Sequence, residues 1–170
     1  RGIAALLLAD NSYGDIPVPQ AESQAHLFLE KALQLDPELA EGWAGMGLYH
    51  YGRPGELDQG IKALEKALAT NPNLVDAANW LNNAYVQANR PADARAILED
   101  VVQRDPLYRP GFANLVFVYG LFGQLDKAIE LVEKTRPFMA TEPTMGLTDS
   151  IISYFKGDVA DSLVYAEKSL

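Results

Sequence analysis

The stretch "LQLDPELAEGWAGMG", residues 33–47, decides the fold, because two apolar patterns of helical spacing meet in it at Asp36-Pro37. The residue before a proline is kept out of the α-helical region, so this dipeptide is expected to end one helix. Proline is tolerated at a helix start, where its missing N–H costs nothing, so the same dipeptide is expected to open the next helix. Trp43 and Gly47 then fall in the first turns of that second helix.

The same layout recurs twice further along the chain, in "LATNPNLVDAANWLNNAYV" (68–86) and "VQRDPLYRPGFANLVFVYG" (102–120). The prolines that follow Asp or Asn lie 35 and then 34 residues apart, at Pro37, Pro72 and Pro106. Gly123 and Gly157 are also 34 residues apart and extend the register towards the C-terminus. A fixed period of this length is typical of a helical repeat protein.

Each repeat contains two stretches with apolar residues at three- and four-residue intervals, which predict two amphipathic helices. Short turn signals separate the helices of a pair, at residues 52–55, 89–91, 122–124 and 156–158. No segment alternates with a period of two, so the predicted fold class is all-α. One helix pair cannot bury its own apolar face, whereas stacked pairs can. The predicted units of a single domain over residues 1–170 are 1–39, 40–74, 75–108, 109–142 and 143–170.

The order of aromatic, small, tyrosine, alanine and proline positions in these units resembles the tetratricopeptide repeat (TPR) family. The resemblance covers the whole chain and implies a right-handed α-solenoid of about five stacked antiparallel helix pairs. For function it implies binding and little more. The residues that carry it are Trp43, Met46, Gly47, Ala67 and Pro72 in the second unit, Leu81, Tyr85, Ala94, Leu98 and Pro106 in the third, and Phe112, Leu115, Tyr119 and Ala128 in the fourth.

The joint after the fourth unit departs from the pattern, because the chain reads "KTRPFMATEPTMG" (134–146) where Asp-Pro is expected. Pro137 is predicted to stop its helix about a turn early and to leave an irregular joint before Pro143. Two explanations stay open: repeat arrays tolerate poor joints near their ends, or the segment is a hinge to a cap or a neighbouring domain.

Composition and charge exclude several classes of protein. The 14 basic and 23 acidic residues give a net charge of −9, so a nucleic-acid binder is not expected. Because the chain has no cysteine, disulfides and thiolate metal sites are excluded. The apolar stretch at residues 2–9 is far shorter than the roughly 20 residues that a membrane helix needs, so no membrane insertion is expected. The chain starts at Arg1 within a helix-like pattern, and we expect it to be a piece of a longer protein.

No motif in the chain indicates catalysis, a metal or a cofactor. His26 and His50 have no partner at the spacing of a metal site, and both are expected to be ordinary surface or half-buried residues. "DNSYGD" (10–15) lacks the spaced ligands and terminal Glu of a calcium loop and is expected to be a plain loop. Phosphate-binding loops and nucleophile elbows are absent from the sequence. We therefore predict a protein that is not an enzyme and has no cofactor.

The first helix of each pair is expected to line the inner surface of the superhelix. Asn79 and Asn83 lie one helical turn apart, and their amides can hydrogen-bond an extended peptide backbone. Aromatic side chains on this surface are candidate anchors. The alternative is that Trp80 packs in the core and the asparagines are surface residues. The peptide-binding candidates are Tyr51, Asn79, Trp80, Asn83, Gln87, Asn114, Phe117 and Leu121, and the predicted inner stripe continues through Leu147, Thr148, Ile151, Tyr154 and Phe155.

The resemblance also permits a comparison with carboxylate-clamp TPR domains, which bind chaperone tails through two asparagines and three basic residues. Asn83 and Asn114 match the two asparagines in register. The basic positions are occupied by Asn79, Thr144 and Thr148, so a carboxylate has little to hold it. A chaperone-tail receptor is therefore not expected, and a neutral or basic peptide is favoured because the chain is acidic.

Our leading hypothesis is a protein–protein interaction module that holds a peptide segment or a partner domain in its concave groove. The alternative is a self-associating or spacer domain without a peptide ligand. A third hypothesis is a small-molecule sensor that uses Tyr49, Tyr51 and Trp80. The style of the repeats is similar to TPR segments of bacterial adenylate cyclases and membrane-linked transcriptional regulators, which implies a bacterial regulatory domain. The sequence does not fix the compartment: the cytoplasm is favoured, or the periplasm if the parent protein is membrane-anchored.

Overall fold

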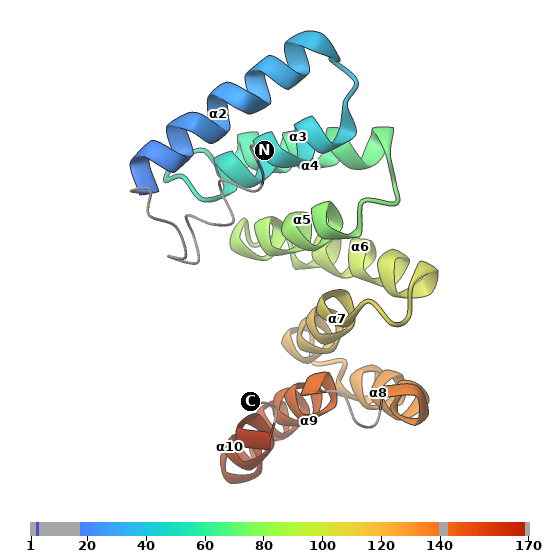
Figure 1. Cartoon of the computed structure of the whole chain (residues 1–170). Coiled ribbons are helices and arrows are strands. Elements are labelled where there is room, and N and C mark those ends of the chain that lie inside the picture. The colour runs from blue at the N-terminus through green and yellow to red at the C-terminus, as the bar shows by residue number, and fades with distance from the viewer. Residues whose placement is uncertain (1–2, 4–17, 140–142, 169–170) are drawn as a thin grey trace. The chain divides into compact units, whose positions relative to one another are not determined.

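The computed structural model describes residue 3, residues 18–139 and residues 143–168, and these parts of the chain contain helices and no strand (Figure 1). The segments 2–9 and 10–15 therefore lie outside the described residues, apart from Ile3. The packing divides the chain into two compact units, residues 1–89 and 90–170. The helices are α2 (Val18–Leu35), α3 (Ala40–Tyr51), α4 (Leu57–Thr70), α5 (Val75–Gln87), α6 (Pro91–Arg104), α7 (Arg109–Leu121), α8 (Leu125–Met139), α9 (Pro143–Lys156) and α10 (Val159–Lys168).

In the first unit, each helix packs on the next in chain order. α2 packs on α3, α3 on α4 and α4 on α5, and Figure 1 shows α3 and α4 side by side. The buried faces repeat at helical spacing, as Ile61, Leu64 and Ala67 do on α4. Since each pair covers the apolar face of its neighbour, the predicted stacking of helix pairs is present in this unit.

In the second unit, α7 is the central element. It packs against α6, α8 and α9, and α9 packs on α10. Phe112, Leu115, Val116 and Val118 of α7 are all buried, so this helix is apolar around most of its circumference. The prediction of an all-α fold built from antiparallel helix pairs is confirmed, whereas the prediction of one domain over residues 1–170 stays a prediction.

The Asp-Pro and Asn-Pro dipeptides end their helices as predicted, but the prediction that proline opens the next helix is wrong. After Pro37, Pro72 and Pro106, the next helix begins three residues later, at Ala40, Val75 and Arg109 respectively. The residue before the proline explains the extra turn, because its side-chain oxygen accepts a hydrogen bond from the backbone N–H two residues on. This bond is 3.0 Å at Asp36, 3.1 Å at Asn71 and 3.1 Å at Asp105.

Helices α3 and α4 approach each other closely at two glycines, Gly47 and Gly60. A Cβ on Gly47 would lie 2.4 Å from Leu64 Cγ, which confirms the prediction that this small residue permits close helix packing. Gly60 faces backbone instead: its Cβ would lie 2.9 Å from Tyr51 N and 3.1 Å from Gly47 O. The sequence argument did not single out Gly60, because its helix pattern continues through it.

Pro137 does not stop α8, which contradicts the prediction made for the joint at residues 134–146. The helix continues to Met139, with Pro137 in its last turn. A proline removes only one backbone hydrogen bond of its helix. Because α8 ends two residues after Pro137, no long helical segment follows the proline. Met139 is buried, and Arg136 donates two hydrogen bonds to Asp149 of α9, at 3.1 and 2.6 Å. These contacts fix the end of α8 against the next helix.

Candidate functional site

The second unit carries an aromatic and aliphatic surface on α7 and α9, which we call the aromatic face: Phe117, Leu121, Leu147, Ile151, Tyr154 and Phe155. Phe117 is 38% exposed, Leu121 48%, Leu147 43% and Tyr154 61%. Phe117 and Leu121 lie one turn apart on α7, and Leu147, Ile151 and Tyr154 follow one face of α9. Exposed apolar groups that adjoin one another in this way mark interaction surfaces more often than scattered ones do.

Helix α7 holds the aromatic face together because it lacks a side chain at Gly120. A Cβ there would lie 2.2 Å from Phe155 Cδ2, so the Phe155 ring occupies the place of the missing side chain. The ring then lies with its centroid 5.7 Å from that of Phe117 and 5.3 Å from that of Tyr154. These are the spacings of tilted and edge-to-face aromatic pairs, so the three rings form one cluster across two helices.

Three of the predicted site residues lie on α7. Phe117 and Leu121 belong to the aromatic face, and Asn114 is half-buried one turn before Phe117. Thr148, predicted to line the same surface, is fully buried and donates its hydroxyl to Met145 O at 3.0 Å, so its side chain cannot contact a ligand. Helix periodicity alone places Thr148 on the stripe, whereas its side chain is buried by the packing of α9 in this unit.

The other five predicted residues lie in the first unit. Tyr51 is the last residue of α3, and Asn79, Trp80, Asn83 and Gln87 are on α5. Gln87 is exposed, and the other four are half-buried. The structure thus brings three of the candidates together on α7 and four on α5. Whether the two sets form one binding surface stays a prediction.

Asn82 is a polar residue that the sequence argument missed. It is 2% exposed, and its Nδ2 donates to Asn83 Oδ1 at 3.0 Å, so one lone pair of the predicted Asn83 acceptor is already used. Among the described residues, Asn82 Oδ1 has no hydrogen-bond partner. The repeat register could have identified Asn82, because it is equivalent to Gly47 of the preceding repeat. A small residue is expected at this position.

The turn between α3 and α4 gathers several charged and aromatic residues of the first unit. Arg53 lies over the Tyr49 ring at 4.9 Å and binds Glu22 of α2 at 3.2 Å. His50 Nδ1 donates to Glu56 Oε2 at 2.8 Å, and this hydrogen bond lowers the pKa of the Glu56 carboxyl. These contacts link α2, α3 and α4, and they occupy Tyr49, which had been a candidate for a small-molecule site.

No group of three or more His, Cys, Asp or Glu in the described parts of the chain could hold a metal ion. None of the described helices has the length and apolar character needed to cross a bilayer.

Comparison with known proteins identifies the repeat. Residues 53–116 match the family model "Tetratricopeptide repeat". The PEX5-related protein of Mus musculus is 30% identical over 115 residues, which is 68% of this chain and 19% of that protein. The human PEX5-related protein is 30% identical over 96 residues, or 56% of this chain and 14% of that protein. The chain thus spans about one fifth of the length of the curated relatives it matches.

Solved structures of MamA have a similar fold. The crystal structure of MamA superposes with a TM-score of 0.67 and 23% identity, and the match covers 88% of this chain and 86% of that one. A structure of MamA AMB-1 gives a TM-score of 0.62 with 21% identity and covers 99% of this chain and 94% of that one. At this level of identity the likeness concerns the fold.

Proposed function

Because this chain is a tetratricopeptide repeat protein, we propose that it is an interaction scaffold that holds a peptide segment of a partner protein against the aromatic face of α7 and α9. The family supports a protein–protein interaction scaffold in general terms. The peptide and its position are the proposal. The observation that carries it is the three-ring cluster of Phe117, Tyr154 and Phe155, with exposed Leu121 and Leu147 beside it.

Aromatic side chains on such a surface provide binding energy with little loss of conformational freedom, since each has only two rotatable side-chain bonds. Phe155 is preorganised by its seat over Gly120, so less ordering is needed when a partner binds.

The chemistry of the partner follows from charge. The net charge of −9 attracts a basic segment and repels an acidic one over long range. Exposed rings such as Tyr154 also bind Lys or Arg side chains through cation–π contacts. A neutral or basic peptide is therefore the favoured ligand of the aromatic face.

The test is selection of a random peptide library against the immobilised chain, followed by affinity measurement by fluorescence anisotropy. The double variant Phe117→Ala/Tyr154→Ala is expected to bind the recovered peptides roughly thirtyfold more weakly, as for the loss of about 2 kcal/mol at an aromatic hot spot. The matched control is Leu27→Ala/Leu35→Ala on α2, which removes exposed apolar groups elsewhere. Equal affinity for the double variant and the wild type would reject this surface.

A second set of variants tests the candidates of the first unit. Trp80→Ala with Asn83→Ala removes the proposed anchor and the peptide-binding amide of α5. If these residues belong to the same binding surface, the peptides recovered above also bind this variant more weakly. Unchanged affinity would restrict the site to the second unit. Retained helical content, measured by circular dichroism, is the control, because both side chains are half-buried.

Self-association is the second candidate function, and one observation favours it. α10 exposes an apolar stripe of Val159 (58%), Leu163 (63%) and Val164 (48%), to which a second copy could bind. Sedimentation at increasing concentration is expected to show a larger species that Leu163→Glu abolishes. A monomer at all concentrations would exclude this function. We retain the prediction that the chain is not an enzyme, since tetratricopeptide repeat proteins are generally non-catalytic scaffolds.

A further inference from the structure

A groove in the second unit lies between α6 and α8 and is floored by α7. It has a volume of about 550 Å³. Leu115 and Tyr119 of α7 form the floor, and the α6 wall continues into the turn at Pro106 and Leu107. A smaller hollow of about 270 Å³ shares Tyr119, Leu131 and Lys134 with the groove and extends it to Lys127. This site is separate from the aromatic face, because Tyr119 and Phe117 are two residues apart and point to opposite sides of α7.

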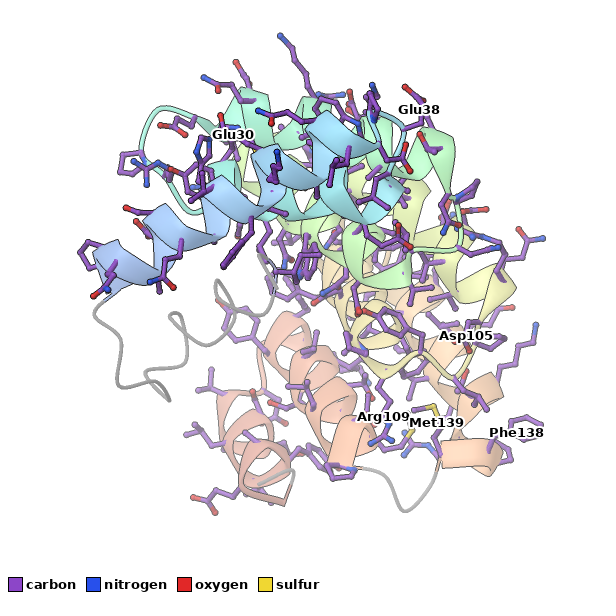
Figure 2. All side chains as sticks on the ribbon, turned by 45° about the horizontal axis from the view of Figure 1, so that its top comes forward. Glu30, Glu38, Asp105, Arg109, Phe138 and Met139 are labelled. Carbon is purple, nitrogen blue, oxygen red and sulfur yellow. The ribbon has the colours of Figure 1, made fainter. Side chains whose placement is uncertain are left out.

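The α8 wall alternates basic and apolar side chains along one face of the helix. Lys127, Leu131, Lys134 and Phe138 are spaced by four, three and four residues, so they lie in one row. Phe138 is 79% exposed at the end of α8, and Figure 2 shows its side chain projecting from the helix. Leu107, on the opposite wall, is 57% exposed. The groove therefore has an apolar end at Phe138 and Leu107 and a basic end at Lys127 and Lys134.

Of the two lysines of the groove, Lys127 lies with its Nζ 5.7 Å from the centroid of the Tyr119 ring, which leaves Lys134 as the cation that can pair with a ligand. In the part of the chain that the structure describes, neither Lys134 nor Lys127 has a carboxylate oxygen within 4.0 Å. Glu99, on the α6 wall, accepts a hydrogen bond from Tyr119 at 3.0 Å and lies 3.7 Å from Arg95, so its charge is compensated. Glu130, at the edge of the smaller hollow, is the remaining acidic group. An occupant with a carboxylate near Lys134 would complete the charge pairing.

We infer that this groove binds an acidic amphipathic helix of a partner protein. The apolar side chains of such a helix, spaced by three or four residues, would lie on Leu107, Leu131 and Phe138, and an Asp or Glu would pair with Lys134. An open groove between two helices suits a helix better than a small molecule, which is normally enclosed over most of its surface. The partner chemistry is opposite to that proposed for the aromatic face. The apolar contacts and the pairing with Lys134 act at contact distance, where they oppose the long-range repulsion from the net charge of −9. The two surfaces would therefore bind different ligands.

To test the inference, the Phe117→Ala/Tyr154→Ala variant serves as the immobilised bait, and peptides that bind it are recovered from a random library of helical peptides. This variant lacks two rings of the aromatic face and keeps the groove intact. Affinities of the recovered peptides are then measured for two further variants of that bait. Lys134→Glu reverses the charge of the groove, and Phe138→Ala removes its exposed apolar rim. The matched controls are Lys156→Glu and Leu35→Ala, which change an exposed lysine and an exposed leucine outside the groove.

We expect the recovered peptides to contain apolar residues at helical spacing and an acidic residue. Their affinity should fall about tenfold for the Lys134→Glu variant and about tenfold for the Phe138→Ala variant. The two controls are expected to leave the affinity unchanged. Because Phe138 and Lys134 are exposed, both groove variants should melt at the temperature of the bait. Recovery of basic peptides only, equal binding to the groove variants, or equal loss with the controls would overturn the assignment.

Discussion

The Tyr119 hydroxyl donates a hydrogen bond to Glu99 at 3.0 Å and thereby joins α7 to the helix before it. The same contact occurs 34 residues earlier, where Tyr85 of α5 donates to Glu65 of α4 at 2.8 Å. Tyr119 is 9% exposed and Tyr85 8%. In both repeats, a hydrogen bond from a tyrosine to a carboxylate thus joins the first helix of one pair to the second helix of the preceding pair.

Replacing Tyr119 with Phe removes this hydrogen bond and keeps the ring. We expect the free energy of unfolding to fall by about 1–2 kcal/mol, because the acceptor is charged but partly exposed. Urea denaturation measures the change. Tyr154→Phe is the control, since that phenol is 61% exposed, and it should have no effect. An unchanged denaturation midpoint for Tyr119→Phe would mean that water replaces the hydrogen bond at no cost.

The same tyrosine makes stability depend on alkaline pH. Burial, and then the hydrogen bond to Glu99, raise the pKa of Tyr119 to about 12, whereas an unfolded chain loses the phenolic proton near pH 10. The folded state therefore holds this proton more tightly, and its contribution to stability is complete below pH 10 and is lost as the pH rises towards 12. The stability difference between the wild type and Tyr119→Phe should shrink between about pH 10 and about pH 12. A constant difference over that range would contradict the assignment.

Gly60 is expected to tolerate no side chain. In Gly60→Ala the new Cβ would lie 2.9 Å from Tyr51 N and 3.2 Å from Tyr51 Cα, and backbone atoms cannot move aside as a side chain does. We expect a loss of about 1–3 kcal/mol from overpacking, even though alanine favours the helix by about 1 kcal/mol. Thermal unfolding provides the measurement. Gly52→Ala is the matched control, because its nearest neighbour is Leu48 O at 4.0 Å, and a similar loss there would refute the steric explanation.

The Arg136–Asp149 pair should couple α8 to α9. Its two hydrogen bonds, at 3.1 and 2.6 Å, raise the pKa of the Arg136 guanidinium. Since the Arg136 side chain is 37% exposed, solvent screens the pair, and we expect a coupling energy of about 1 kcal/mol in a double-mutant cycle of Arg136→Gln and Asp149→Asn. The coupling should decrease at high salt. The exposed pair Arg104–Asp100 within α6 serves as a control and should couple by less than about 0.5 kcal/mol.

The sequence predicted the helices well because their signals are local. Apolar periodicity, the dipeptides at Pro37, Pro72 and Pro106 and the glycine turns all act within a few residues. Gly55, Gly123 and Gly157 adopt positive φ angles of 81°, 66° and 85°, as the turn signals indicated. The position of the helix starts after proline was mispredicted, because a side-chain hydrogen bond from Asp36 and its equivalents competes with the helix for the next backbone N–H groups.

The candidate site was less predictable, because burial depends on neighbours that lie far away in the sequence. Periodicity identified Phe117 and Leu121, but it placed the fully buried Thr148 on the same surface. It passed over Asn82, which is buried although asparagine is usually exposed. The groove beside Lys134 could not have been predicted from one helix, since its walls come from α6 and α8 and its floor from α7.

α7 presents Phe117 and Tyr119 in opposite directions, so a single α-helix separates the aromatic face from the groove. The diameter of an α-helix with its side chains is about 10–12 Å. Two polypeptides bound on opposite sides of α7 would therefore be separated by little more than the diameter of one helix. A chain with this arrangement would act as a spacer of fixed width, able to bring a basic strand and an acidic helix from different molecules to a defined separation.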